Sequence, residues 1–159
     1  MRHADASGPS VDALAFAATR HCLTGCAIGE VVGTLVASAL GFPTTGALLL
    51  GIALAFVFGY ALTFVPLLQA AMPVGRAVGL TLAADTVSIV VMELVDNVFV
   101  LLVPGAMSAG VTDPLFWGSL LIGLVIAFAA AYPVNRWLVR RGRGHALTQH
   151  GDAHHEAVL

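Results

Sequence analysis

Long apolar blocks, separated by short polar segments, dominate the pattern of this 159-residue chain. Four of these blocks reach the length of about 20 residues that an α-helix needs to cross the hydrocarbon core of a bilayer. The expected spans cover residues 22–40, 46–68, 77–103 and 115–138. The pattern therefore predicts an all-α fold, an integral membrane four-helix bundle.

Segments containing proline and glycine separate the blocks. Residues 41–45, 69–75 and 104–114 each contain a proline, which ends a helix or fits a turn. Pro133 falls inside the fourth span, where we expect a kink near the end of the helix. Three short loops therefore connect consecutive spans.

The chain outside the spans divides into a lead-in and a tail. Residues 1–20 are expected to be cytoplasmic and partly helical, with Ser10 as the N-cap of the helical part. The membrane domain then takes residues 21–138. Residues 139–159 form a His-rich tail, which we expect to be cytoplasmic and disordered.

The positive charges fall on one side of this predicted topology. All seven basic residues are arginines, namely Arg2, Arg20, Arg76, Arg136, Arg140, Arg141 and Arg143. Positive residues concentrate on the cytoplasmic side of membrane proteins. Four spans with both termini in the cytoplasm place every arginine inside. We therefore predict an inner (cytoplasmic) membrane protein with an N-in/C-in orientation.

The composition and motifs argue against several classes of function. The chain is 58% hydrophobic and only 10% charged, against about 25% charged in soluble domains. It has no basic patch interleaved with aromatic residues, so no nucleic-acid partner is expected. Walker A, HExxH, GxSxG and CxxCH motifs are all absent from the sequence. We therefore expect no enzyme, no catalytic residues, no nucleotide and no haem.

Four acidic residues inside the apolar blocks are the main candidates for function: Glu30, Asp85, Glu93 and Asp96. A charge near the bilayer centre costs about 2.5 kcal/mol or more. No Arg or Lys lies deep in the spans to neutralise these acids, so their counter-charge must be a proton or a bound cation. The pattern predicts cation handling rather than a structural ion pair.

The first span carries two neighbouring stripes of residues. Gly25, Gly29 and Gly33 repeat every four residues, a spacing that lets another helix approach closely. We expect this glycine stripe to serve in helix packing, and it is also a candidate oligomer interface. The adjacent positions form a polar stripe: Cys22, Cys26, Glu30, Thr34 and Ser38. A polar stripe in lipid is expected to face protein or water.

The third span supplies partners for the polar stripe. At 100° per residue, Asp85, Met92 and Asp96 fall within about 40° of one another. Glu93 and Asn97 lie to one side of them. Carboxylate, amide and thioether groups therefore share one half of this helix.

Depth suggests which acids meet. Glu30 follows Arg20 by ten residues, and Asp85 follows Arg76 by nine. At 1.5 Å per residue, both acids would lie about 13–15 Å above the cytoplasmic boundary. Glu30 and Asp85 are therefore predicted to face each other.

The ligand types leave the identity of the ion open. Borderline or soft ligands that suit copper or zinc are His21, Cys22, Cys26 and Met92. The carboxylates and Asn97 are harder oxygen ligands, which suit manganese or zinc, or protons. The two thiols are expected to be free or metal-bound rather than joined in a disulfide. We expect a transition-metal ion, either copper, zinc or manganese.

The tail offers a weaker metal-binding candidate. Four histidines lie within it: His145, His150, His154 and His155. A His-rich segment can bind a transition metal. The alternative is a solvated tail with no such role.

Three classes of function follow from these features. The first is conduction of a transition-metal ion along a carboxylate, thiol and thioether path between spans one and three. The alternatives are a proton or monovalent-cation channel, and a non-transporting module that binds a metal or lipid and assembles with partners. A membrane redox or maturation enzyme is a more distant alternative. One chain of four spans offers few helices to enclose an ion path, so a homo-oligomer is expected. Metal-handling partner proteins are expected with the first class of function.

Four strings of residues carry a family resemblance. They are His21-Cys22-Leu23-Thr24-Gly25-Cys26, Met92-Glu93-Leu94-Val95-Asp96-Asn97, Pro104-Gly105-Ala106-Met107 and Pro133-Val134-Asn135-Arg136-Trp137. In combination they resemble an uncharacterised bacterial domain-of-unknown-function family of small four-span membrane proteins. The resemblance covers residues 20–145. It implies the four-span fold and brings no established activity or substrate.

Overall fold

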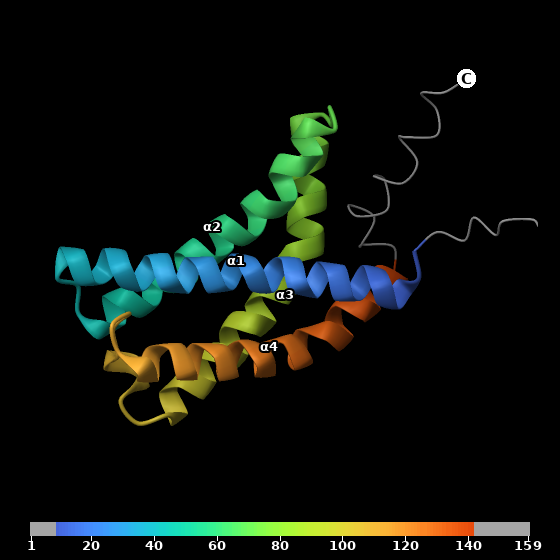
Figure 1. Ribbon diagram of the computed structural model, residues 1–159. Helices are drawn as coiled ribbons and strands as arrows, with labels where there is room; N and C mark the ends of the chain where they lie inside the picture. The colour runs from blue at the N-terminus through green and yellow to red at the C-terminus, as the bar shows by residue number, and fades with distance from the viewer. Residues whose placement is uncertain (1–8, 142–159) are drawn as a thin grey trace, which may run out of the picture.

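Four long α-helices make up most of residues 9–141, the part of the chain that the computed structural model describes (Figure 1). They are α1 (Val11–Leu40), α2 (Thr44–Gln69), α3 (Val74–Leu102) and α4 (Pro114–Arg140), and a short 3-10 helix, η1 (Ala106–Ser108), precedes α4. Each long helix is long and apolar enough to cross a membrane. The prediction of a four-span helical membrane protein is confirmed.

The helix ends follow from local signals in the sequence. Ser10 caps α1, because its hydroxyl oxygen accepts a hydrogen bond from Ala13 N at 3.2 Å. Gly41 ends α1 in the left-handed conformation, with φ 68°. At the start of α4, the Asp113 side chain accepts a hydrogen bond from Leu115 N at 2.8 Å. Ser10 is the N-cap as predicted, and the lead-in and the first span form one continuous helix, α1.

The glycine stripe of α1 packs against α2. The facing pairs are Gly25 with Gly59, Gly29 with Ala55 and Gly33 with Gly51. A Cβ atom on Gly33 would lie 2.6 Å from Cα of Gly51, closer than two carbon atoms can approach. Because α2 covers this face, the alternative that the stripe forms an oligomer interface is wrong.

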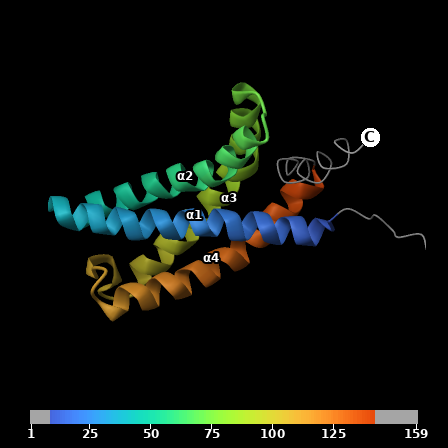
Figure 2. The ribbon, with the colours of Figure 1, turned by 45° about the horizontal axis from the view of Figure 1, so that its top comes forward.

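The helices are not all parallel. Helices α1 and α4 lie side by side, whereas α3 crosses α1 (Figures 1 and 2). The hairpin that joins α2 to α3 projects away from both α1 and α4, and Leu67 and Ala77 pack inside this projecting end. The main core collects at the crossing: Cys22, Cys26, Ala55, Ile89, Met92, Ala127 and Ala131. The predicted functional stripe of α1 thus runs through the core.

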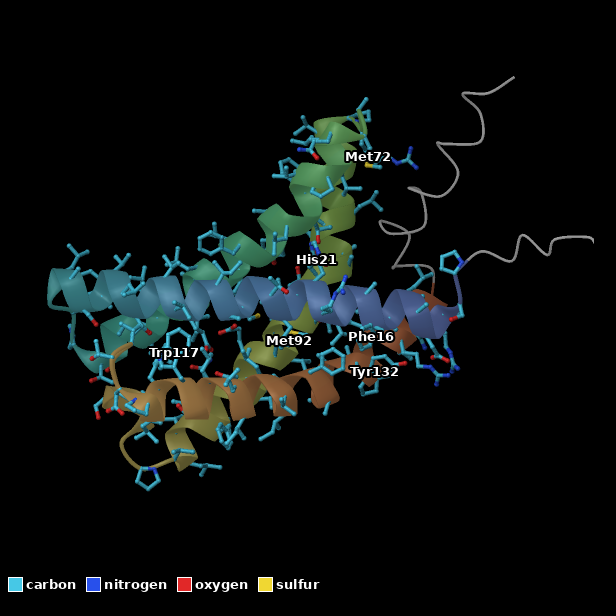
Figure 3. All side chains as sticks on the ribbon, viewed as in Figure 1. Phe16, His21, Met72, Met92, Trp117 and Tyr132 are labelled. Atoms are coloured by element: carbon cyan, nitrogen blue, oxygen red, sulfur yellow. The ribbon has the colours of Figure 1, made fainter. Side chains whose placement is uncertain are left out.

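The start of α1 and the end of α4 lie together at one end of the molecule. Arg136 forms an ion pair with Asp12. The rings of Phe16 and Phe128 meet edge to face with their centroids 5.5 Å apart, and Phe16 lies near Tyr132 in Figure 3. An even number of spans requires this arrangement. The side of the membrane that this end faces stays a prediction.

Apolar side chains cover the outside, and the acidic side chains of α3 lie inside. Leu102, Val125 and Leu94 are 75%, 69% and 65% exposed. Asp85 and Asp96, by contrast, are buried. This distribution suits a protein surrounded by lipid, because lipid tails solvate apolar side chains and exclude charged ones.

Candidate cation-binding site

A cavity of about 230 Å³ lies among all four long helices and the loop that contains η1. Its polar lining residues are Glu30, Thr34, Ser38, Thr44, Glu93, Asp96, Asn97, Ser108 and Ser119. The lining contains no arginine, lysine or histidine. We call this space the acidic cavity.

Two carboxyl groups from different helices meet in the acidic cavity. Glu30 of α1 and Asp96 of α3 lie within hydrogen-bonding reach of each other when one of them carries a proton. Two charged carboxylates at such a separation repel strongly in a low-dielectric interior. A shared proton or a bound cation relieves that repulsion.

The carboxylate of Asp96 fits against α4 because the facing residue, Gly123, has no side chain. Its Oδ1 atom lies against Gly123, and a Cβ atom at that position would overlap Oδ1. Among residues 9–141, neither carboxylate oxygen of Asp96 has a hydrogen-bond partner. An unsatisfied buried polar group costs about 1–3 kcal/mol, and more when it is charged. Asp96 therefore presents two open oxygen ligands.

Glu93 is held by its neighbour Asn97. The Asn97 Nδ2 group donates to the backbone oxygen of Glu93 at 2.7 Å and to its Oε2 at 3.3 Å. Oε1 of Glu93 is buried and has no hydrogen-bond partner in the described part of the chain. Asn97, which we predicted as a ligand, thus orients Glu93 so that one carboxylate oxygen stays open.

Each cysteine thiol lies beside one carboxylate. Cys22 Sγ donates to Oδ1 of Asp85 at 3.7 Å. Cys26 lies within hydrogen-bonding reach of Glu93. Both thiols are buried and free of disulfides, as predicted. The pairs continue the polar line of α1 from the acidic cavity into the core.

The prediction that Glu30 faces Asp85 is wrong. Asp85 contacts Cys22, which lies eight residues before Glu30, a separation of roughly 12 Å along a helix. Glu30 meets Asp96 instead. The reason is that α3 begins at the projecting end of the α2–α3 hairpin, so the arginines that precede the two spans do not mark one depth.

Most of the residues predicted as one metal site therefore divide into two groups. One group lines the acidic cavity: Glu30, Glu93, Asp96 and Asn97. The other lies around Asp85: His21 and Cys22. Figure 3 shows His21 and Met92 near the crossing of α1 and α3. Within residues 9–141, no three His, Cys, Asp or Glu side chains are grouped closely enough to hold a metal ion. The predicted ligands His145, His150, His154 and His155 lie outside the described residues.

Several buried polar residues near these groups were missed from the sequence. Asn135 donates from Nδ2 to Thr19 Oγ1 and to Ser88 Oγ, both at 2.9 Å, and so joins α4 to α1 and α3. An amide inside an apolar block is a signal for such a contact. Thr63, near Asp85, and Thr81, one helical turn before Asp85, give no comparable signal because threonine is common in membrane helices.

The fold and the buried carboxylates together define a polytopic α-helical membrane protein with a polar interior. The family model described as "Domain of unknown function (DUF4396)" matches residues 13–144, so the chain belongs to this family. The predicted resemblance to a domain-of-unknown-function family is thereby confirmed. No curated protein and no solved structure matches the chain.

Proposed function

We propose that the protein binds a cation in the acidic cavity and conducts it through the helix bundle. The observation that carries this proposal is the pair of carboxyl groups of Glu30 and Asp96, which meet in a cavity without a basic lining residue. Glu93 adds an open oxygen to the same space. A mobile positive ion is the partner that such a cavity accommodates.

A transition-metal ion is the first candidate for the conducted ion. Beyond the acidic cavity, the thiols of Cys26 and Cys22 each accompany a carboxylate. Sulfur and oxygen ligands together suit copper or zinc. Met107, a further lining residue of the cavity, adds a thioether. An ion would therefore meet mixed ligand pairs as it moved along α1.

Proton conduction is the second candidate, and one observation favours it. Among residues 9–141, no three His, Cys, Asp or Glu side chains are grouped closely enough for a metal site. A structural zinc site takes four ligands, whereas a proton moves between successive donors and acceptors. Each pair can share or pass a proton, and this supports protons as the second candidate.

The distribution of arginines supports the inner membrane as the location, with both termini in the cytoplasm. A homo-oligomer is part of the proposal because the apolar outer faces of the four helices leave room for lateral contacts between copies. Metal-handling partner proteins would accompany the first candidate ion. A reporter that is active only in the cytoplasm, fused to the C-terminus, tests the orientation, and an inactive fusion at normal expression would contradict it.

Ion uptake into liposomes tests the proposed function. Wild type is compared with Glu30→Gln and Glu93→Gln, and the matched control is Asp12→Asn, which changes an exposed acid at the far end of α1. Indicators inside the vesicles report copper, zinc, manganese and pH. We expect uptake to fall at least about tenfold in the two cavity variants, which corresponds to 1.4 kcal/mol, and to stay unchanged in the control.

The outcomes separate the classes of function. Metal uptake supports the first candidate, and uptake of protons alone supports the second. Bound metal in the purified protein, found by elemental analysis without any flux, would favour a non-transporting module. Equal flux in wild type and both cavity variants would remove the acidic cavity from the mechanism.

A further inference from the structure

Asp85 lies in a polar cluster that is separate from the acidic cavity. Asp85 is not among the residues that line that cavity, and its side chain is only 5% exposed. Besides the Cys22 thiol, the hydroxyl of Thr63 and the imidazole of His21 lie near its carboxylate. Thr81 precedes Asp85 by one helical turn, so the two side chains share a face of α3. Helices α1, α2 and α3 thus each contribute to this Asp85 cluster.

Several atoms of the Asp85 cluster are buried without a hydrogen-bond partner in the described chain. They are Oδ2 of Asp85, Oγ1 of Thr81 and Nε2 of His21. Buried polar atoms in native proteins nearly always have a partner. An open oxygen of one buried carboxylate, with two further open atoms in the same cluster, indicates a binding site rather than a packing defect.

Thr81 differs from other hydroxyl residues in these helices. Thr19, Thr86 and Ser119 each donate to the carbonyl oxygen four residues earlier, at 2.7 Å. This is the usual partner of a hydroxyl group in an apolar helix. The Thr81 hydroxyl makes no such bond and is only 3% exposed. It is therefore available as a ligand on the face of α3 that carries Asp85.

The charge and type of the ligands indicate the class of ion. Carboxylate and hydroxyl oxygens are hard ligands, which suit alkali and alkaline-earth cations better than soft metals. A single carboxylate balances one positive charge, whereas a divalent ion would leave a net charge buried in the core. The Cys22 thiol donates to Oδ1 of Asp85, which leaves Oδ2 for the ion. We propose that Asp85, Thr63 and Thr81 bind one monovalent alkali cation, with Na⁺ as the test ion.

A proton on Asp85 is the competing explanation. A protonated Oδ2 would donate one hydrogen bond and would satisfy one neighbouring acceptor. Because it donates only once, it would engage either Thr63 or Thr81 and not both hydroxyl groups together. A cation bound by Asp85, Thr63 and Thr81 engages all three oxygen ligands at once, which a single proton does not.

This inference deepens the proposed function and rests on it for its physiological meaning. An ion at Asp85 lies beside Cys22, on the proposed path, and would be exchanged for the conducted ion. Binding at Asp85 does not require conduction, however. It is therefore measurable whether or not flux is observed.

Thermal unfolding of the purified full chain in detergent tests the Asp85 site. NaCl is replaced stepwise by choline chloride at constant pH and ionic strength, and a ligand that binds only the folded state raises the Tm. We expect a saturable rise with Na⁺ in wild type and in Glu30→Gln, and no rise in Asp85→Asn. Thr81→Val is expected to raise the apparent Kd for Na⁺ at least about tenfold. Thr86→Val, on the same helix, is the matched control and should keep the wild-type response.

Three results would overturn the site: a Tm that responds to pH but not to Na⁺, a full Na⁺ response in Asp85→Asn, or a wild-type Kd in Thr81→Val. If Asp85→Asn does not fold, Thr81→Val decides the question, because it keeps the shape and the charge of the site. Loss of flux in Glu30→Gln with an intact Na⁺ response supports both sites. A Tm insensitive to Na⁺ with normal flux in wild type would overturn the Asp85 site alone.

Discussion

The contact between α1 and α2 at Gly29 leads to the sharpest prediction about stability. A Cβ atom at Gly29 would overlap the backbone nitrogen and Cα of Ala55. Carbon atoms in contact normally lie about 3.5–4.0 Å apart. The obstacle is backbone and not a flexible side chain, so Gly29→Ala requires one helix to move away from the other.

The size of the effect follows from two opposing contributions. Forcing an extra methyl group into a packed interface costs about 1–3 kcal/mol. Alanine recovers about 1 kcal/mol relative to glycine in a helix interior. Gly79→Ala in α3 is the matched control, because no atom outside its own helical turn lies within 4 Å of the added Cβ. The difference between the two variants removes the helix-propensity contribution, and we expect it to be about 1–3 kcal/mol.

Unfolding in mixed detergent, followed by circular dichroism, measures this difference. We expect Gly29→Ala to unfold at a lower fraction of denaturing detergent than Gly79→Ala, with wild type between them or close to Gly79→Ala. Equal stability of the two variants would refute the close packing of α1 on α2. If Gly79→Ala destabilised the protein more than Gly29→Ala, the face of α3 that carries Gly79 would be packed against another helix rather than exposed.

Three further predictions concern the polar interior. Gly123→Ala should displace the carboxylate of Asp96 and reduce cation uptake. Gly118→Ala is the control, because its added Cβ meets no neighbouring atom. Equal uptake in both variants would show that Gly123 does not position Asp96. Asn135→Ala removes two buried hydrogen bonds at about 0.6 kcal/mol each, so a loss of about 1 kcal/mol is expected in detergent unfolding, and an unchanged midpoint would contradict this. Both buried cysteines should resist a water-soluble maleimide until the protein is unfolded, and rapid labelling of the native protein would show that the core is open to water.

The positions of the last three long helices could be predicted closely, whereas α1 begins at Val11, well before the span expected at residues 22–40. The third and fourth spans were expected at residues 77–103 and 115–138, and the helices run from Val74 to Leu102 and from Pro114 to Arg140. A bilayer requires each crossing segment to satisfy its own backbone hydrogen bonds over a given apolar length. That requirement acts on each segment alone, so a single sequence reveals it.

The partners of the candidate residues could be predicted only in part. The polar stripe of α1 was expected to face protein, and Cys22 and Cys26 are indeed buried. Glu30, however, was paired with Asp85 and meets Asp96 instead. Which residues meet depends on how far one helix slides along another, and hydropathy contains no information about that shift.

The amino-acid sequence by itself determined that this chain forms four membrane helices and that its acids lie inside them, because both follow from the free energy of transfer into lipid. Only the tertiary structure decided that the acids divide between a cavity and a separate cluster. The close approach of α1 to α2 along the glycine stripe and the projection of the α2–α3 hairpin set the relative positions of the helices. These positions arise from side chains that fit one another across helices, a property of the assembled molecule and not of any one segment.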